Sequence, residues 1–161
     1  YDILPISKYS EGTYIIQIII IAFSLFSFLI TFIREIVKDI EDIEGDNKFK
    51  SNTLPIKYGI TYAKKVTVIF IIITLALLAY FQYFQFSVLN TTFSFNISYW
   101  GANNISVLYT ILIELFLVLL LKYIYSAKTK SDFENASKIC KYLMILGVLS
   151  IPTFTFSHLY I

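Results

Sequence analysis

Three aspartates with a regular spacing, Asp39-x-x-Asp42-x-x-x-Asp46, are the residues of this chain best suited to carry chemistry. They stand in residues 34–46, where six of thirteen residues are acidic, directly after twenty residues without a charge. If one helix continues through them, the three share a stripe of about 60° with Glu35, because each helical residue turns by about 100°. Like charges at such spacings destabilise a helix, and the repulsion grows near lipid. The pattern therefore predicts a positive partner for the stripe.

Magnesium is one such partner. Hard divalent cations take carboxylate oxygens, and Mg²⁺ is typically held by one or two carboxylates together with substrate phosphates. The alternative is a solvated face beside a membrane, balanced by Arg34 and Lys38. The spacing of the aspartates by itself leaves both interpretations open.

The residues after the aspartates favour the metal site. Gly45 is expected to end or bend the helix, which brings Lys48, Lys50 and Lys57 within reach of the same place. Carboxylates for Mg²⁺ beside lysines for phosphate oxygens are typical of a pyrophosphate site.

Membrane spans must position this site. The chain has 161 residues, 57% of them hydrophobic and only 15% charged, whereas soluble domains are about half apolar and a quarter charged. Four segments are long enough to cross a bilayer: residues 14–33, 66–84, 105–121 and 142–161. Spans in lipid must satisfy their own backbone hydrogen bonds. The predicted fold is therefore all-α, a polytopic membrane bundle of four transmembrane helices.

The positive charges predict how the bundle is oriented. Residues 34–65 hold seven of the thirteen basic residues and residues 122–141 hold five, while residues 82–104 carry no charge. The positive-inside rule places the first two connectors, including the Asp-rich loop 34–65, in the cytoplasm and the C-terminus outward. Residues 126–136 are expected to form a polar turn. The net charge of +2 is too small and too scattered to indicate a nucleic-acid partner.

The string "REIVKDIEDIEGD…TLPIKYG" resembles the second aspartate-rich motif of the UbiA-type intramembrane prenyltransferases. Within that family it is most similar to the branch that transfers a geranylgeranyl group to geranylgeranylglycerol phosphate. The shared elements are Arg34-Glu35, the three aspartates, Gly45-Asp46, Thr53-Leu54-Pro55 and Gly59.

In that family, nine membrane helices surround a cavity, and two Asp-rich cytoplasmic motifs hold Mg²⁺ and the prenyl pyrophosphate. The resemblance implies that residues 1–161 form the C-terminal half of such a bundle. The N-terminal half, with the first motif of the Asn-Asp-x-x-Asp type, is absent from this chain. The chain alone is therefore expected to be inactive.

The resemblance also implies the roles of individual residues. The catalytic residues and Mg²⁺ ligands are Asp39, Asp42 and Asp46. The residues that contact the pyrophosphate are Arg34, Lys38, Lys50 and Lys57, although the first two are equally suited to anchor lipid headgroups. The family usually has a glycine and then a lysine ahead of Thr-Leu-Pro, where this chain has Lys50 and Asn52. The phosphate-binding lysine has thus either moved to Lys50 or been lost. Four phenylalanines are candidates to line a prenyl channel or simply to pack: Phe23, Phe26, Phe28 and Phe32.

The function implied is Mg²⁺-dependent transfer of a prenyl group, most simply geranylgeranyl, to a glycerol-phosphate acceptor during membrane lipid synthesis in a prokaryotic cell membrane. One alternative replaces the acceptor by an aromatic ring of a quinone-type pathway. Another is a transporter or a structural membrane protein with a divalent-cation site. A transporter should carry paired ionisable residues at mid-membrane depth, and only Glu114 qualifies. The Asp-Gly-x-x-Ala-Arg signature of CDP-alcohol phosphotransferases is absent.

Overall fold

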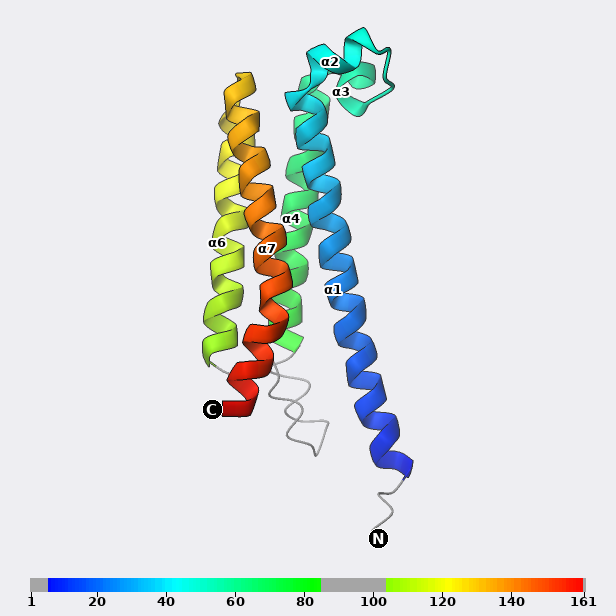
Figure 1. Cartoon of the computed structure of the whole chain (residues 1–161), viewed down its shortest axis with the longest axis vertical. Coiled ribbons are helices and arrows are strands. Elements are labelled where there is room, and N and C mark those ends of the chain that lie inside the picture. Colours follow the sequence, from blue (N-terminus) through cyan, green and yellow to red (C-terminus); the bar gives the residue numbers. More distant parts are fainter. Residues whose placement is uncertain (1–5, 85–103, 161) are drawn as a thin grey trace.

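Four long helices lie side by side in the computed structural model (Figure 1). It describes residues 6–84 and 104–160, and the side chains of residues 16–83 and 104–157. The elements in chain order are α1 (Ile6–Glu41), α2 (Ile43–Lys48), α3 (Leu54–Tyr58), α4 (Ile60–Phe84), α6 (Asn104–Ser126) and α7 (Lys130–Tyr160). These residues contain no strand, and α1, α4, α6 and α7 are long and apolar enough to cross a membrane. The predicted all-α membrane bundle is confirmed, and the protein is an integral membrane protein.

The helices extend beyond the apolar runs that predicted them. The polar turn expected at 126–136 is wrong in extent, because only residues 127–129 lie between α6 and α7. A capping box explains the early start of α7: the Asp132 carboxylate accepts hydrogen bonds from the backbone N–H groups of Lys128 (2.9 Å) and Thr129 (2.8 Å). The Thr129 hydroxyl in turn accepts from the Asp132 N–H at 3.4 Å. The ends of a helix are set by capping hydrogen bonds, whereas hydropathy indicates only the part of the helix that lies in lipid.

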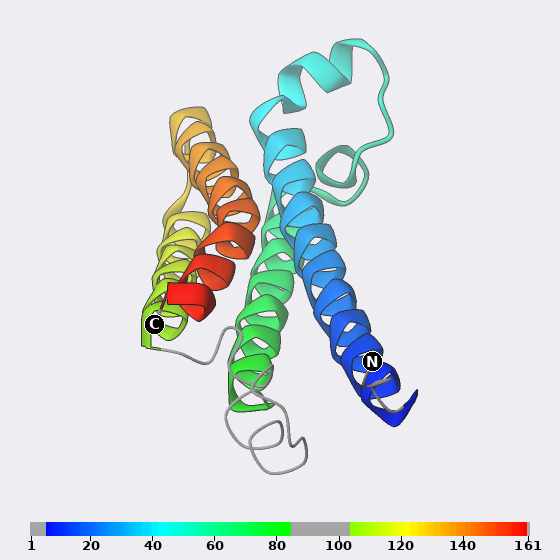
Figure 2. The same cartoon turned by 60° about the horizontal axis from the view of Figure 1, so that its bottom comes forward.

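The two basic connectors lie at the same end of the bundle, as their charges predicted (Figures 1 and 2). We call this the acidic end, because α1 carries the aspartates there, and α7 ends at the opposite one. Lys64, in the first turns of α4, donates hydrogen bonds to the carbonyls of Tyr125 (3.2 Å) and Ala127 (2.7 Å). This cation therefore satisfies carbonyls at the C-terminus of α6 and fastens the two connectors together.

Packing is dense in the half of the bundle near the acidic end. Helix α1 packs against α4 and α7, and α6 packs against the same two helices, so the four form a square. The side chains that fill its centre are almost fully buried; they include Ile33, Val37, Ile71, Leu117, Leu120 and Leu143. The opposite half is held partly by hydrogen bonds between α6 and α7: Tyr109 donates to the Leu146 carbonyl at 2.8 Å, and the Ser106 and Ser157 hydroxyls lie 3.1 Å apart.

Candidate functional site

The aspartates lie where α1 bends into α2. Asp42 stands between the two helices with φ −99° and ψ 15°, a sparsely populated backbone conformation. Helical hydrogen bonds continue across it, from the Asp42 N–H to the Lys38 carbonyl (2.9 Å) and from the Asp46 N–H to the Asp42 carbonyl (3.0 Å). Figure 1 shows α2 leaning away from the axis of α1. The expectation that Gly45 makes this bend is wrong, because Gly45 lies inside α2.

The glycine that does end a helix is Gly59, whose φ of 88° suits the residue after a helical C-terminus. The bend at Asp42 needs no glycine, since its backbone stays at negative φ.

Two of the three aspartates interact across the bend. Asp39 and Asp46 are half-buried, whereas Asp42 is exposed. Three carboxylates repel the charge of Asp39, those of Asp46, Glu35 and Asp42, and the contribution of Asp46 is the largest of the three. Lys38 opposes them. The charges of the acidic stripe therefore interact, and Asp46 is the acid whose charge Asp39 feels most strongly.

The described residues contain no group of three histidine, cysteine or acidic side chains that could hold a metal ion by themselves. Mg²⁺ generally needs only one or two protein carboxylates when phosphate oxygens supply further ligands. Asp39 and Asp46 fit a magnesium ion that arrives with a diphosphate, and they do not form a closed cage.

The acidic stripe lies on the flank of the bundle. The core residues of this part of α1 are Ile30, Ile33, Ile36, Val37 and Ile40. At about 100° per residue they point roughly 60–180° away from Asp39 around the helix, and Ile36 is the nearest to it. The aspartates are thus turned away from the packed centre of these four helices, and α3 packs against α1 and α2 beside them.

The predicted phosphate contacts are arranged unevenly. The Arg34 guanidinium donates to the Glu35 carboxylate at 2.7 Å and is half-buried. Lys38, Lys50 and Lys57 are exposed at the acidic end, and the Lys57 ammonium lies 5.3 Å from the centre of the Tyr58 ring. Arg34 is already engaged by an acid, while the three lysines point to solvent.

Lys50 has an unusual backbone. Its φ is 53°, the left-handed region that a residue with a side chain enters at a cost of about 1–2 kcal/mol. This is the position where the related motif usually has glycine, and the fold retains the turn that glycine favours. The turn is closed by hydrogen bonds from the Lys50 N–H to the Asn47 carbonyl (3.3 Å) and from the Ser51 N–H to the Asp46 carbonyl (3.0 Å).

Sequence reasoning gave no role to Thr53, although Thr53-Leu54-Pro55 is part of the motif. Its hydroxyl oxygen is buried and has no hydrogen-bond partner among the described residues. Thr53 directly precedes α3 in an extended conformation and makes no side-chain cap. Because an unpaired buried hydroxyl is costly, Thr53 is suited to donate to an oxygen of a bound ligand.

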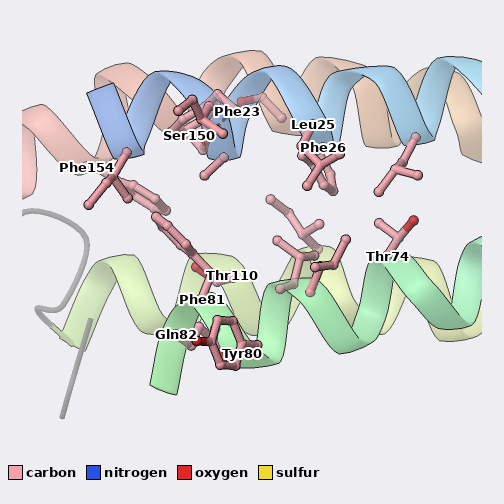
Figure 3. A pocket seen from close by; sticks show the side chains of 18 residues that line it. Phe23, Leu25, Phe26, Thr74, Tyr80, Phe81, Gln82, Thr110, Ser150 and Phe154 are labelled. Atoms are coloured by element: carbon pink, nitrogen blue, oxygen red, sulfur yellow. Dashed lines mark hydrogen bonds between the residues drawn. The ribbon is translucent and has the colours of Figure 1, made fainter. Parts of the chain in front are cut away.

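An apolar cavity of about 300 Å³ lies in the half of the bundle away from the aspartates (Figure 3). All four long helices line it, mostly with aliphatic and aromatic side chains. Of the four phenylalanines considered for a prenyl channel, Phe23 and Phe26 line this cavity and Phe28 and Phe32 do not. Its volume is at the lower end of the range for ligand pockets.

Glu114 is the ionisable residue that the sequence places at mid-membrane depth. It does not line the cavity, and its buried carboxylate oxygen Oε1 has no hydrogen-bond partner within the described parts of the chain. No second ionisable side chain is therefore paired with it there.

The chain is similar to curated proteins named digeranylgeranylglyceryl phosphate synthase. It is 34% identical to that of Methanosphaera stadtmanae over 134 residues, which cover 83% of this chain and 43% of the relative. It is 32% identical to that of Methanobrevibacter smithii over 152 residues, 92% of this chain and 46% of the relative. A shorter stretch of 52 residues is 50% identical to the protein of Thermococcus sibiricus. The chain thus spans less than half the length of the first two relatives. No family model and no solved structure matches it significantly.

Proposed function

The chain belongs to the UbiA-type intramembrane prenyltransferase family, and from this premise we propose that it is the C-terminal half of a geranylgeranyltransferase. The donor is geranylgeranyl diphosphate and the acceptor is the hydroxyl of a glycerol-phosphate lipid. The observation that carries the proposal is the pair Asp39 and Asp46, half-buried beside exposed lysines at one end of a membrane bundle.

The diphosphate binds at the acidic end, where Lys50 and Lys57 attract its oxygens and the Thr53 hydroxyl donates to one of them. Mg²⁺ held by Asp39 and Asp46 would neutralise charge on the diphosphate. The allylic C–O bond breaks, and its electron pair leaves with the diphosphate. The lysines attract the diphosphate more strongly as this negative charge develops, which lowers the activation barrier to breaking the C–O bond.

The acceptor hydroxyl then attacks the allylic carbon to form the new C–O bond, and its proton passes to the departing diphosphate. Water must be kept from this carbon, or hydrolysis competes with transfer. The apolar helices beside the acidic end supply one wall against water, and the cavity between them accommodates the hydrocarbon chain. In this arrangement the acidic end faces the cytoplasm of a prokaryotic cell, and the product enters the surrounding membrane lipid.

The names of the relatives favour a glycerol-phosphate acceptor over an aromatic one. The transporter hypothesis gains no support, since Glu114 has no ionisable partner among the described residues. The half of the family fold that carries the Asn-Asp-x-x-Asp motif would supply the rest of the site.

The test is transfer by the complete membrane enzyme, given Mg²⁺, geranylgeranyl diphosphate and a panel of glycerol-phosphate and aromatic acceptors. We expect Asp39→Ala and Asp46→Ala to lower kcat by about a hundredfold or more, the scale found when one group that stabilises charge in a transition state is removed. Glu44→Gln is the matched control, because Glu44 is an exposed acid of the same segment that lies off the stripe. Full activity of both aspartate variants would contradict the proposal.

A further inference from the structure

An apolar stripe on α1 leads from the aspartates to the cavity. On the side of the helix that carries Asp39, the preceding four turns present Phe32, Phe28 and Leu25. The rings of Phe28 and Phe32 stack with centroids 6.1 Å apart, and Phe32 packs against Phe70 of α4 at 4.7 Å. All three stripe residues are exposed, and Leu25 lines the cavity. A chain anchored at Asp39 can therefore follow this stripe into the cavity without crossing the packed core.

Five polar side chains belong to the lining of the cavity. The hydroxyls of three of them donate to carbonyls of their own helices: Thr74 to Phe70 (2.7 Å), Thr110 to Ser106 (2.9 Å) and Ser150 to Gly147 (2.6 Å). The other two are Tyr80 and Gln82, and the buried amide nitrogen of Gln82 has no hydrogen-bond partner among the described residues. The remaining lining is largely hydrocarbon, which suits an apolar chain. Since a cavity of about 150 Å³ accommodates benzene, this one holds roughly two isoprene units.

The distance along α1 shows which units these are. Phe26 precedes Asp39 by thirteen residues, which is about 20 Å at the helical rise of 1.5 Å per residue. An isoprene unit adds four bonds of about 1.5 Å, or about 5 Å when the chain is extended. Measured along the helix axis, a chain of four units anchored at Asp39 thus extends to the level of Phe26. A chain of three units ends near Leu29, about 15 Å from Asp39.

At the level of Phe26, its ring lies against Gly147 of α7. Figure 3 shows Phe26 pointing from α1 into the cavity. A Cβ atom built on Gly147 of α7 would lie 2.9 Å from Cε1 and 3.5 Å from Cδ1 of the Phe26 ring. Both residues line the cavity. A side chain at position 147 therefore requires the Phe26 ring or the backbone of α7 to shift.

We propose that Phe26, seated against Gly147, contacts the terminal isoprene unit of the donor and sets the preferred chain length at four units. This inference rests on the proposed prenyl transfer and adds the residues that select the donor. A larger residue at position 147 shortens the usable cavity, and a smaller residue at position 26 lengthens it.

The experiment compares kcat/KM for farnesyl (three units), geranylgeranyl (four) and farnesylgeranyl (five) diphosphates in the complete enzyme. Gly147→Ala and Gly147→Val should lower the ratio of geranylgeranyl to farnesyl about tenfold or more, the scale of discrimination by pocket size. Phe26→Ala should raise the ratio of farnesylgeranyl to geranylgeranyl by a similar factor. Unchanged ratios in both Gly147→Val and Phe26→Ala would overturn the inference.

Two variants serve as controls. Val148→Leu enlarges the side chain next to Gly147, and Phe156→Ala removes a ring from α7. Both residues are exposed, at 70% and 61%, and neither lines the cavity. They should leave all ratios unchanged.

A second measurement needs neither turnover nor a folded variant. The unmodified enzyme is labelled with a geranylgeranyl diphosphate that carries a photoreactive group on its last unit. Labels within residues 22–29 or 147–154 support the inference, even if transfer is never observed and the proposed function fails. Labels found only elsewhere overturn it, even if transfer is observed.

Discussion

Lys50 offers a test of the local structure beside the aspartates. At its φ of 53° a side chain costs about 1–2 kcal/mol, while glycine costs about 0.5–1 kcal/mol more entropy than alanine on folding. The difference leaves Lys50→Gly more stable than Lys50→Ala by about 1 kcal/mol in this turn. Lys48 is the matched control, because it lies at the end of helix α2. At position 48 the order of stability should reverse, and Lys48→Gly should be less stable than Lys48→Ala by about 1 kcal/mol.

Amide hydrogen exchange is the assay, because the strain is local. The Ser51 N–H bonds to the Asp46 carbonyl at 3.0 Å and reports opening of the turn. A gain of about 1 kcal/mol corresponds to about fivefold slower exchange in Lys50→Gly than in Lys50→Ala. The left-handed turn at Lys50 is refuted if the Ser51 amide exchanges as slowly in Lys50→Ala as in Lys50→Gly. It is also refuted if the glycine and alanine variants have the same order of stability at positions 48 and 50.

Two further predictions concern groups that join or face the connectors. Lys64→Met should lower the free energy of unfolding by about 1–2 kcal/mol, because the carbonyls of Tyr125 and Ala127 lose a charged donor. Thermal unfolding in detergent measures this loss. Lys65→Met, at an exposed neighbouring position, should change the stability little. Thr53→Val should leave the unfolding temperature unchanged or raise it, since the buried hydroxyl has no partner, yet it should raise KM for the prenyl diphosphate about tenfold, and Thr53→Ser should restore it. A lowered unfolding temperature with an unchanged KM would show that Thr53 is structural.

The sequence predicted the membrane helices well because the signal is simple. A run of about twenty apolar residues has few alternatives in lipid, and all four runs are helices. The ends of the helices were harder to predict, because a cap is a set of a few hydrogen bonds in a polar segment. Thr129 and Asp132 start α7 twelve residues before the predicted span. Their Thr-x-x-Asp spacing was visible in the sequence and belongs to the capping-box type.

The geometry of the acidic segment could be predicted only in part. The helical spacing correctly grouped Asp39 and Asp46, whose charges interact. It could not locate the bend, because Asp42 adopts its conformation without a residue type that demands it. Nor could spacing reveal the cavity, whose shape depends on side chains from four helices. The contact of Phe26 with Gly147 joins residues 121 positions apart and has no local signal.

The buried core also limits the path that the prenyl chain of the proposed donor can take. Ile33 and Val37 are fully buried, so no hydrocarbon chain passes from Asp39 to the cavity through the centre of these four helices. The remaining route is the flank of α1, over Phe32 and Phe28, and 62% of Phe28 is exposed there. A surface of this kind shields an allylic cation only if something covers it. The proposed reaction therefore requires a second wall over this flank, and the half of the family fold that carries the first Asp motif is the element suited to provide it.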